Sequence, residues 1–307
     1  MKKMVYFILF GGMSCIYGQQ EASFTQYSIS PSIVNPAYAA SDFTTNIGVA
    51  VRKQWESSFE QKSILAFGQI PINERIEMSF NITSDDMAKG IVNQKFIGLN
   101  LAYILKTSDK ARLSFGIRGG VNLLSKNFEN IILEQGTVLD DKAFDVMLND
   151  KSTTPIIGAG IFFYKKKYFI GLSIPSLIKT DNFYANGNKV TFLSKSDKFL
   201  TAGYIFNLNT NIKIKPNLLL KYNEGLFYPN GLLNILFYER FEIGYMNKIN
   251  ISNNFMLGFT LGKNFTFNYT YEVFNKPFGK ISSNSNEFSI RYKFSNSKNN
   301  VVSPRFY

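Results

Sequence analysis

Apolar and polar residues alternate along much of this chain, most clearly between Arg112 and Leu123. One set of alternate positions in this stretch is apolar: Leu113, Phe115, Ile117, Val121 and Leu123. The positions between them are polar or small: Ser114, Gly116, Arg118, Gly120 and Asn122. Because successive side chains of a β-strand point to opposite faces, this period of two predicts a strand with one apolar and one polar face.

The pattern recurs to the end of the chain and predicts about fourteen strands, an even number as in single-chain bacterial barrels. The strands are expected at 46–54, 62–70, 76–83, 96–105, 112–123, 156–164, 168–174, 198–206, 212–222, 231–238, 240–247, 254–262, 264–273 and 286–294. The connections after even-numbered strands are short, whereas those after odd-numbered strands include the long segments 124–155 and 175–197.

Three features favour a membrane barrel over a soluble β-sandwich, in which strands would also alternate. The apolar face is rich in aromatic residues, as on lipid-facing strands, and the connections sort into short turns and longer loops. Charges in mid-strand keep to the opposite face: Arg52, Glu77, Arg118, Lys213, Lys215, Lys221, Glu242, Glu272 and Arg291. A sandwich core cannot bury so many charges, but a polar lumen accepts them. We therefore predict an all-β, antiparallel, transmembrane outer-membrane β-barrel whose lumen holds balanced charge.

Composition agrees with this prediction. The 307 residues include 30 Phe and 17 Tyr, and the mean hydropathy is −0.07. Membrane helices need runs of about 20 apolar residues, and none follows the first twenty positions.

The first twenty positions resemble a signal peptide, expected over residues 1–18, with Lys2 and Lys3 before a short apolar core. The single Cys15 lies inside it, and lipidation of Cys15 is the minor alternative.

Two polar segments flank the barrel, which is expected over 46–294. Residues 19–45 carry Pro31 and Pro36 together with scattered apolar anchors, which a free tail has little reason to carry. This N-terminal segment is predicted either to plug the lumen or to dock a periplasmic partner. Residues 295–307 form the expected C-terminal tail.

Few residue types in this chain are suited to catalysis. The chain has no His, which excludes Ser-His-Asp and Cys-His arrangements and His-ligated metals. We expect no enzyme, cofactor or metal site.

The net charge of +12 suits anionic outer-membrane lipid or an acidic periplasmic partner better than nucleic acid, because the aromatic face lies opposite the lumen charges. Lys165, Lys166 and Lys167, at a predicted periplasmic turn, are a candidate contact or an interfacial anchor.

An ordered set of short motifs resembles the PorP/SprF family, outer-membrane proteins of the Bacteroidetes type IX secretion and gliding-motility system. The motifs are Gln26-Tyr27, Asn35-Pro36-Ala37-Tyr38-Ala39, Arg52-Lys53-Gln54-Trp55, the strands at 113–120, 168–175 and 199–204, and Lys215 to Tyr222. The chain departs from the family pattern at Ala40, where Gly is usual, and at Glu56-Ser57-Ser58-Phe59, which replaces a loop resembling Gly-Ala-Pro.

The resemblance implies a non-enzymatic accessory barrel. Family members are associated with a periplasmic ring lipoprotein complex, and several support secretion or surface attachment of a large adhesin cargo. The implied partner-binding residues are Gln26, Tyr27, Asn35, Pro36, Ala37, Tyr38 and Trp55, with Lys165, Lys166 and Lys167 added from the charge pattern. The implied location is the outer membrane, with long loops extracellular and both termini periplasmic. A passive porin and an outer-membrane hydrolase are the rival interpretations.

Overall fold

The computed structural model describes residues 27, 30–39, 44–55, 60–127, 132–133, 136–137, 149–185, 188–194, 196–275 and 284–294. The expected signal peptide (1–18) and C-terminal tail (295–307) lie outside these residues, as does Gln26. The described chain is all-β apart from one short 3-10 turn, η1, at Pro31–Ile33. Within the described residues, no helix has the length and hydropathy needed to cross a membrane.

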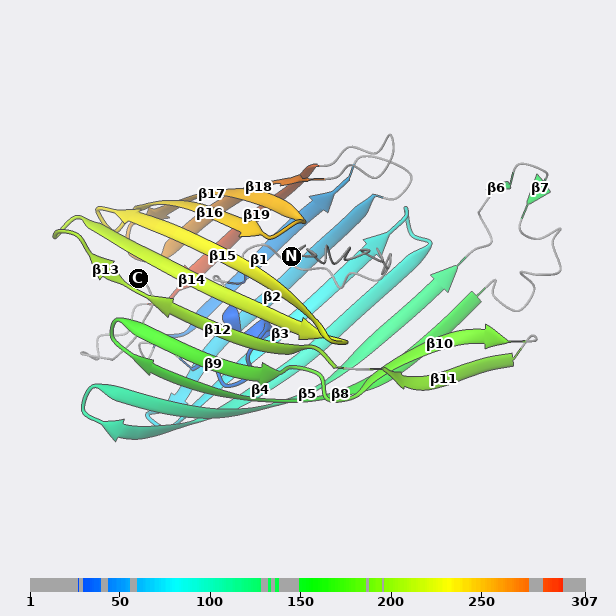
Figure 1. The fold of residues 1–307 in the computed structure, drawn as a ribbon, viewed down its shortest axis with the longest axis horizontal. Coiled ribbons are helices and arrows are strands. Elements are labelled where there is room, and N and C mark those ends of the chain that lie inside the picture. The colour runs from blue at the N-terminus through cyan, green and yellow to red at the C-terminus, as the bar shows by residue number, and fades with distance from the viewer. Residues whose placement is uncertain are drawn as a thin grey trace, which may run out of the picture.

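The strands form one closed antiparallel barrel of 14 strands (Figure 1). They are β1 (Asn46–Gln54), β2 (Gln61–Asn73), β3 (Ile76–Met87), β4 (Val92–Ser108), β5 (Ala111–Asn127), β8 (Asn149–Lys165), β9 (Tyr168–Ile174), β12 (Lys198–Tyr204), β14 (Ile212–Asn223), β15 (Leu226–Phe237), β16 (Phe241–Lys248), β17 (Ser252–Leu261), β18 (Phe265–Phe274) and β19 (Asn284–Lys293). The predicted architecture is confirmed, and β1 and β9 have the predicted bounds.

Each strand pairs with its neighbours in the chain, and β1 closes the wall against β19. One strand is interrupted. The short β13 (Phe206–Asn207) continues β12 in the same register against β14, where Gly203 pairs with Asn217 and Phe206 with Ile214. Pro216 lies opposite the break, and its missing N–H cannot take part in the ladder there.

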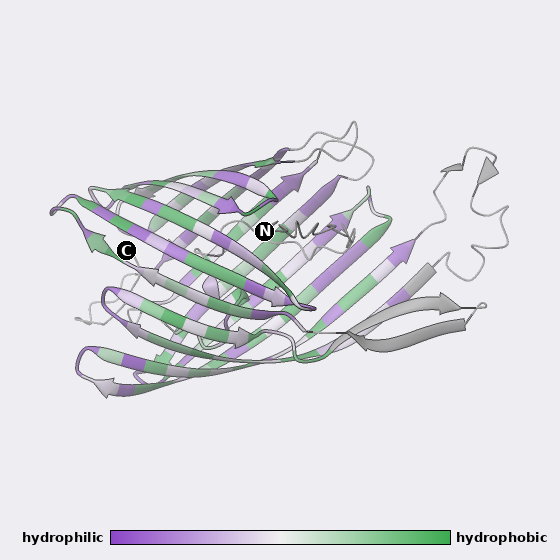
Figure 2. Ribbon diagram, viewed as in Figure 1, coloured by the Kyte–Doolittle hydropathy of each residue, from purple (hydrophilic) through white to green (hydrophobic). Residues whose placement is uncertain are grey.

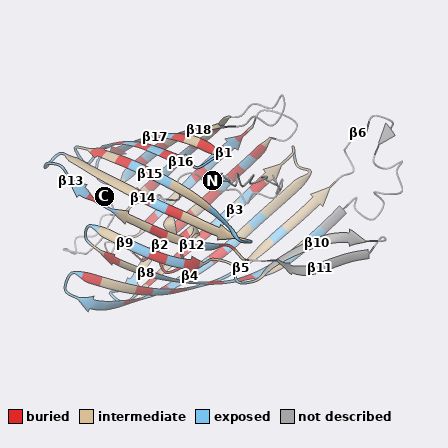
Figure 3. Cartoon of the chain, in the orientation of Figure 1, coloured by how far each residue is buried: buried red, intermediate tan, exposed pale blue. Residues whose placement is uncertain are grey.

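The two faces of the wall differ as predicted (Figures 2 and 3). Apolar side chains point outward and stay exposed, among them Ile117 at 64% and Leu257 at 58% of their full accessible surface. Arg52, Glu77 and Arg118 fall on the buried, inward parity. A closed wall pairs its own backbone groups, so its exposed outer apolar face suits a lipid environment.

The two ends of the barrel differ in the length of their connections. Short turns close one end, and the wall extends furthest at the other, where β5 and β8 project beyond the shorter β9 (Figure 1). The expected long loop 175–197 contains a separate hairpin of β10 (Lys179–Ala185) and β11 (Asn188–Ser194). Two further short strands, β6 (Ile132–Leu133) and β7 (Gly136–Thr137), pair within the other long connection.

One connection at the long-loop end is much tighter than the sequence suggested. β15 begins at Leu226, five residues before the predicted start at 231, so Glu224 and Gly225 alone join it to β14. Both residues have positive φ, 49° and 87°. A two-residue hairpin requires this conformation, and glycine adopts it without a steric cost.

Candidate functional site

A segment of the chain that precedes β1 lies inside the barrel. We call Tyr27 and residues 30–39 the plug segment. Its residues are buried or half-buried although none belongs to the wall. Local backbone hydrogen bonds give it a compact shape: Val34 N donates to Pro31 O at 3.1 Å and Tyr38 N to Asn35 O at 3.0 Å. The chain then enters β1 at the short-turn end, where Phe294 N donates to Thr45 O.

Asn35 fixes the plug segment to the wall. Its side-chain Oδ1 accepts a hydrogen bond from Ala37 N at 2.9 Å, and its Nδ2 donates to Ile161 O of β8 at 3.1 Å. The amide therefore holds its own turn and the wall at the same time. An aspartate could not make the second bond, because an ionised carboxylate only accepts.

A hollow of glycines receives the Asn35-Pro36-Ala37 turn. Gly116 of β5 pairs with Gly160 of β8, and both lie on the inward parity. A Cβ at Gly116 would lie 2.3 Å from the backbone N of Ala37, and one at Gly160 would lie 2.2 Å from Asn35 Oδ1. At Gly116 the atoms met are backbone, which cannot rotate away, and at Gly160 the atom met belongs to the Asn35 amide, whose two bonds hold it in place. The two glycines therefore leave room for the turn.

Arg118 makes the charged contact to the plug segment. Its Nη2 donates to Ile33 O at 2.8 Å and also to Ser32 O, while its Nε donates to Asn100 Oδ1 at 2.7 Å. Ser30 Oγ adds a bond to Asn81 Oδ1 on β3 at 3.0 Å. A buried guanidinium is costly unless its donors are paired, and the plug's carbonyls supply partners.

Apolar packing completes the plug's contacts. The Tyr38 ring lies 4.9 Å from that of Phe162, and Tyr164 OH donates to Ala39 O at 2.7 Å. Elsewhere Ile33 packs on Leu65 and Phe67, and Tyr27 packs on an apolar group of Leu219, Leu232 and Met246. Burial in this group raises the pKa of the Tyr27 hydroxyl well above its usual range.

The sequence interpretation missed this apolar patch of the lumen. Its signal was present as breaks in the alternation, where apolar residues are continuous: Ile64 to Phe67, Ile161 to Tyr164 and Leu218 to Leu220. Such runs are typical of strands covered on both faces. Here the outer face of these strands is turned to lipid, and the plug segment covers the inner face.

Little space remains where the plug meets β9, β12 and β14. A cavity of about 20 Å³ lies there, lined by Tyr27, Val34, Phe169, Thr201, Lys215 and other residues. One water molecule needs about 10–15 Å³ by this measure, so the cavity is of water size rather than metabolite size.

Removing the Arg118 guanidinium should loosen the plug. We expect Arg118→Gln to raise the hydrogen-exchange rates of the plug amides. Ile33 O would lose its partner and Ser32 O would keep only the 3.5 Å bond from Asn100 Nδ2, and a carbonyl left unpaired in a buried place costs about 1–3 kcal/mol. Arg112→Gln on the same strand is the matched control, since Arg112 donates to carbonyls of its own turn, Ser108 O and Ala111 O. Equal protection of residues 30–39 in both variants would contradict the role given to Arg118.

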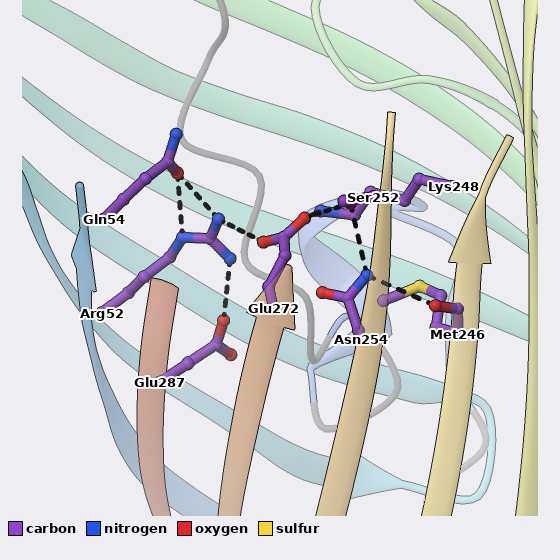
Figure 4. Close-up of polar contacts among 8 residues, drawn as sticks. All are labelled: Arg52, Gln54, Met246, Lys248, Ser252, Asn254, Glu272 and Glu287. Carbon is purple, nitrogen blue, oxygen red and sulfur yellow. Dashed lines mark hydrogen bonds and ion pairs between the residues drawn. The ribbon is translucent and has the colours of Figure 1, made fainter. Parts of the chain in front are cut away.

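A second buried polar group lies near the long-loop end of the lumen (Figure 4). Arg52 Nη2 lies 2.6 Å from Glu272 Oε2, and Arg52 Nη1 lies 3.4 Å from Glu287 Oε2. Lys248 Nζ reaches the other Glu272 oxygen at 2.8 Å, and Gln54 Oε1 accepts from Arg52. Two cations and two carboxylates thus neutralise one another, which limits the cost of removing them from water.

The candidate residues occupy three separate places. Tyr27, Asn35, Pro36, Ala37 and Tyr38 lie in the lumen as part of the plug segment. Trp55 follows β1 at the long-loop end with φ of 59°, and its ring lies 6.2 Å from that of Phe274. Lys165, Lys166 and Lys167 lie at the short turn between β8 and β9. The three groups do not form one site. A partner at the long-loop end would contact Trp55, whereas a partner at the short-turn end would contact the three lysines.

The family of the chain follows from a match over most of its length. The model of the type IX secretion system membrane protein PorP/SprF family matches residues 16–292. This chain belongs to the PorP/SprF family. The matched range includes the plug segment and nearly all of the barrel, whose last strand ends at Lys293. No curated protein matches the sequence.

Solved structures similar to this PorP/SprF barrel are outer-membrane barrels. The CymD monoaromatic hydrocarbon channel is 10% identical, with a TM-score of 0.52 over 87% of this chain and 93% of that one. The Ralstonia pickettii toluene transporter TbuX is 11% identical, with a TM-score of 0.51 over 85% and 92%. Similarity at this level shows the fold alone. Together with the family it identifies an outer-membrane protein.

Proposed function

We propose that this barrel is a non-enzymatic component of type IX secretion that links the machinery to the outer membrane. In this role it holds the periplasmic ring lipoprotein complex, or it supports secretion and surface attachment of an adhesin cargo. The observation that carries the proposal is the plug segment, held in the lumen by Asn35, Arg118 and Tyr164. A lumen that holds a segment of its own chain is better suited to assembly than to free diffusion of solutes.

The proposed orientation follows from the connections. Outer-membrane barrels have short periplasmic turns and longer extracellular loops. The short turns, the start of β1 and the end of β19 would then face the periplasm and its ring complex. The β10–β11 hairpin would face outside, the side on which a cargo adhesin would be retained.

Deleting residues 20–38 with the signal peptide kept should separate barrel assembly from function. We expect an assembled, heat-modifiable barrel, because the wall pairs its own strands without the plug. We also expect loss of secretion. Normal secretion would contradict the proposal, whereas loss of the barrel would show that the segment is needed for folding.

Two measurements test the proposed role directly. A pull-down of the tagged protein from its own cell envelope should recover the ring lipoproteins or an adhesin. Single-channel recording of the purified protein should give no large, stable conductance. Recovery of no envelope protein, together with an open and stable channel, would favour the porin alternative.

A further inference from the structure

The positive charge of the short-turn end is concentrated on one side of the barrel. Residues 106–112 and 165–167, which are the β4–β5 and β8–β9 turns with the strand ends beside them, carry six cations and one carboxylate, a net charge of +5. The two turns are adjacent, because Ala111 of β5 pairs with Lys165 of β8. The carboxylate, Asp109, is paired with Lys106 at 2.9 Å. Within the described chain, neither Lys166 nor Lys167 has a carboxylate partner, and both are exposed.

Aromatic rings lie directly beside these lysines on the outward face. The cluster consists of Phe163, Tyr168, Tyr204 and Phe206, all on the outward parity of their strands. Tyr168 and Tyr204 stack with ring centroids 6.3 Å apart, and Tyr204 lies 4.4 Å from Phe206. Lys165 Nζ lies 5.5 Å from the centre of the Tyr168 ring. Tyrosines at this level of a barrel mark the boundary between acyl chains and headgroups.

We propose that Lys165, Lys166 and Lys167, together with this aromatic cluster, bind an anionic phospholipid of the adjoining leaflet. The ammonium groups would contact the headgroup phosphates, and the rings would pack on the upper part of the acyl chains. An acidic protein would account for the lysines but not for aromatic side chains that face the bilayer. The inference is independent of the secretion role, since it needs no other protein.

Lipid titration of the full mature barrel, followed by native mass spectrometry in neutral detergent, tests this site. Phosphatidylglycerol should bind more tightly than phosphatidylcholine, and added salt should remove the preference. Each basic residue near an anionic surface contributes roughly a fivefold effect, so Lys165→Gln/Lys166→Gln/Lys167→Gln should weaken phosphatidylglycerol binding by about 100-fold. A matched control, Lys62→Gln/Lys89→Gln/Lys95→Gln, removes the same charge from exposed positions at the long-loop end and should have no effect.

Three results would overturn the assignment. Equal binding of the two lipids would remove the headgroup preference. Complete competition by inorganic phosphate, at an ionic strength where sodium chloride leaves binding in place, would indicate a free-anion site, because phosphate alone cannot use the aromatic cluster. Lysine-dependent binding of polyglutamate without binding of phosphatidylglycerol would indicate a protein-docking surface instead. If the triple variant does not assemble, Lys166→Gln alone tests the same role of the lysines. It is expected to weaken phosphatidylglycerol binding roughly fivefold.

Discussion

Replacing Leu257 by arginine is expected to remove most of the assembled barrel from the outer membrane. Leu257 points outward from the middle of β17 and is 58% exposed on the apolar face. Placing an arginine on the lipid face near the bilayer midplane costs about 2–4 kcal/mol. That is a large fraction of the stability of a typical domain, so the variant should misassemble and be degraded.

Asn268→Arg is the matched control at the same level of the wall. Asn268 points inward and pairs across the strands with Gly258, the residue next to Leu257. A Cβ built on Gly258 would lie 2.7 Å from Asn268 Oδ1 and 3.7 Å from Glu242 Oε2, so an arginine at 268 has an acidic neighbour. Heat-modifiable migration measures the assembled fraction of both variants. Equal assembly would mean that the inner and outer faces have been assigned wrongly.

Gly116→Ala is expected to expel the plug while leaving the barrel assembled. The added methyl would lie 2.3 Å from Ala37 N and Pro36 C, which are backbone atoms that cannot rotate away. Overpacking of this kind costs about 1–3 kcal/mol, and here it destabilises the contact between the plug segment and the wall. The expected result is faster hydrogen exchange over residues 30–39 and a channel that conducts in planar bilayers.

Gly119→Ala provides the control on the same strand. Gly119 faces outward, and a Cβ there would meet nothing within 4 Å. Alanine is at least as compatible with a strand as glycine, so this variant should behave as the natural protein in both measurements. A closed, fully protected plug in the Gly116→Ala protein would show that the glycine hollow is not what seats the segment.

The local pattern of the sequence was sufficient to predict the wall. Alternation assigns each side chain to one of two faces, and the lipid requires one face to be apolar over every strand. The inward positions of Arg52, Arg118 and Glu272 were therefore predictable before any strand was placed beside another. The bounds of β1 and β9 were also predictable, because turn residues end the apolar pattern there.

The contents of the lumen were decided by tertiary structure, because they depend on strands that are distant in sequence. Asn35 meets Ile161, and Arg118 meets Ile33, contacts that exist only once the barrel has closed around the segment. Ser114 illustrates the limit: alternation marks it as a lumen position tolerant of charge, but it is completely buried. Alternation predicts on which face a residue lies, whereas long-range packing decides what covers that face.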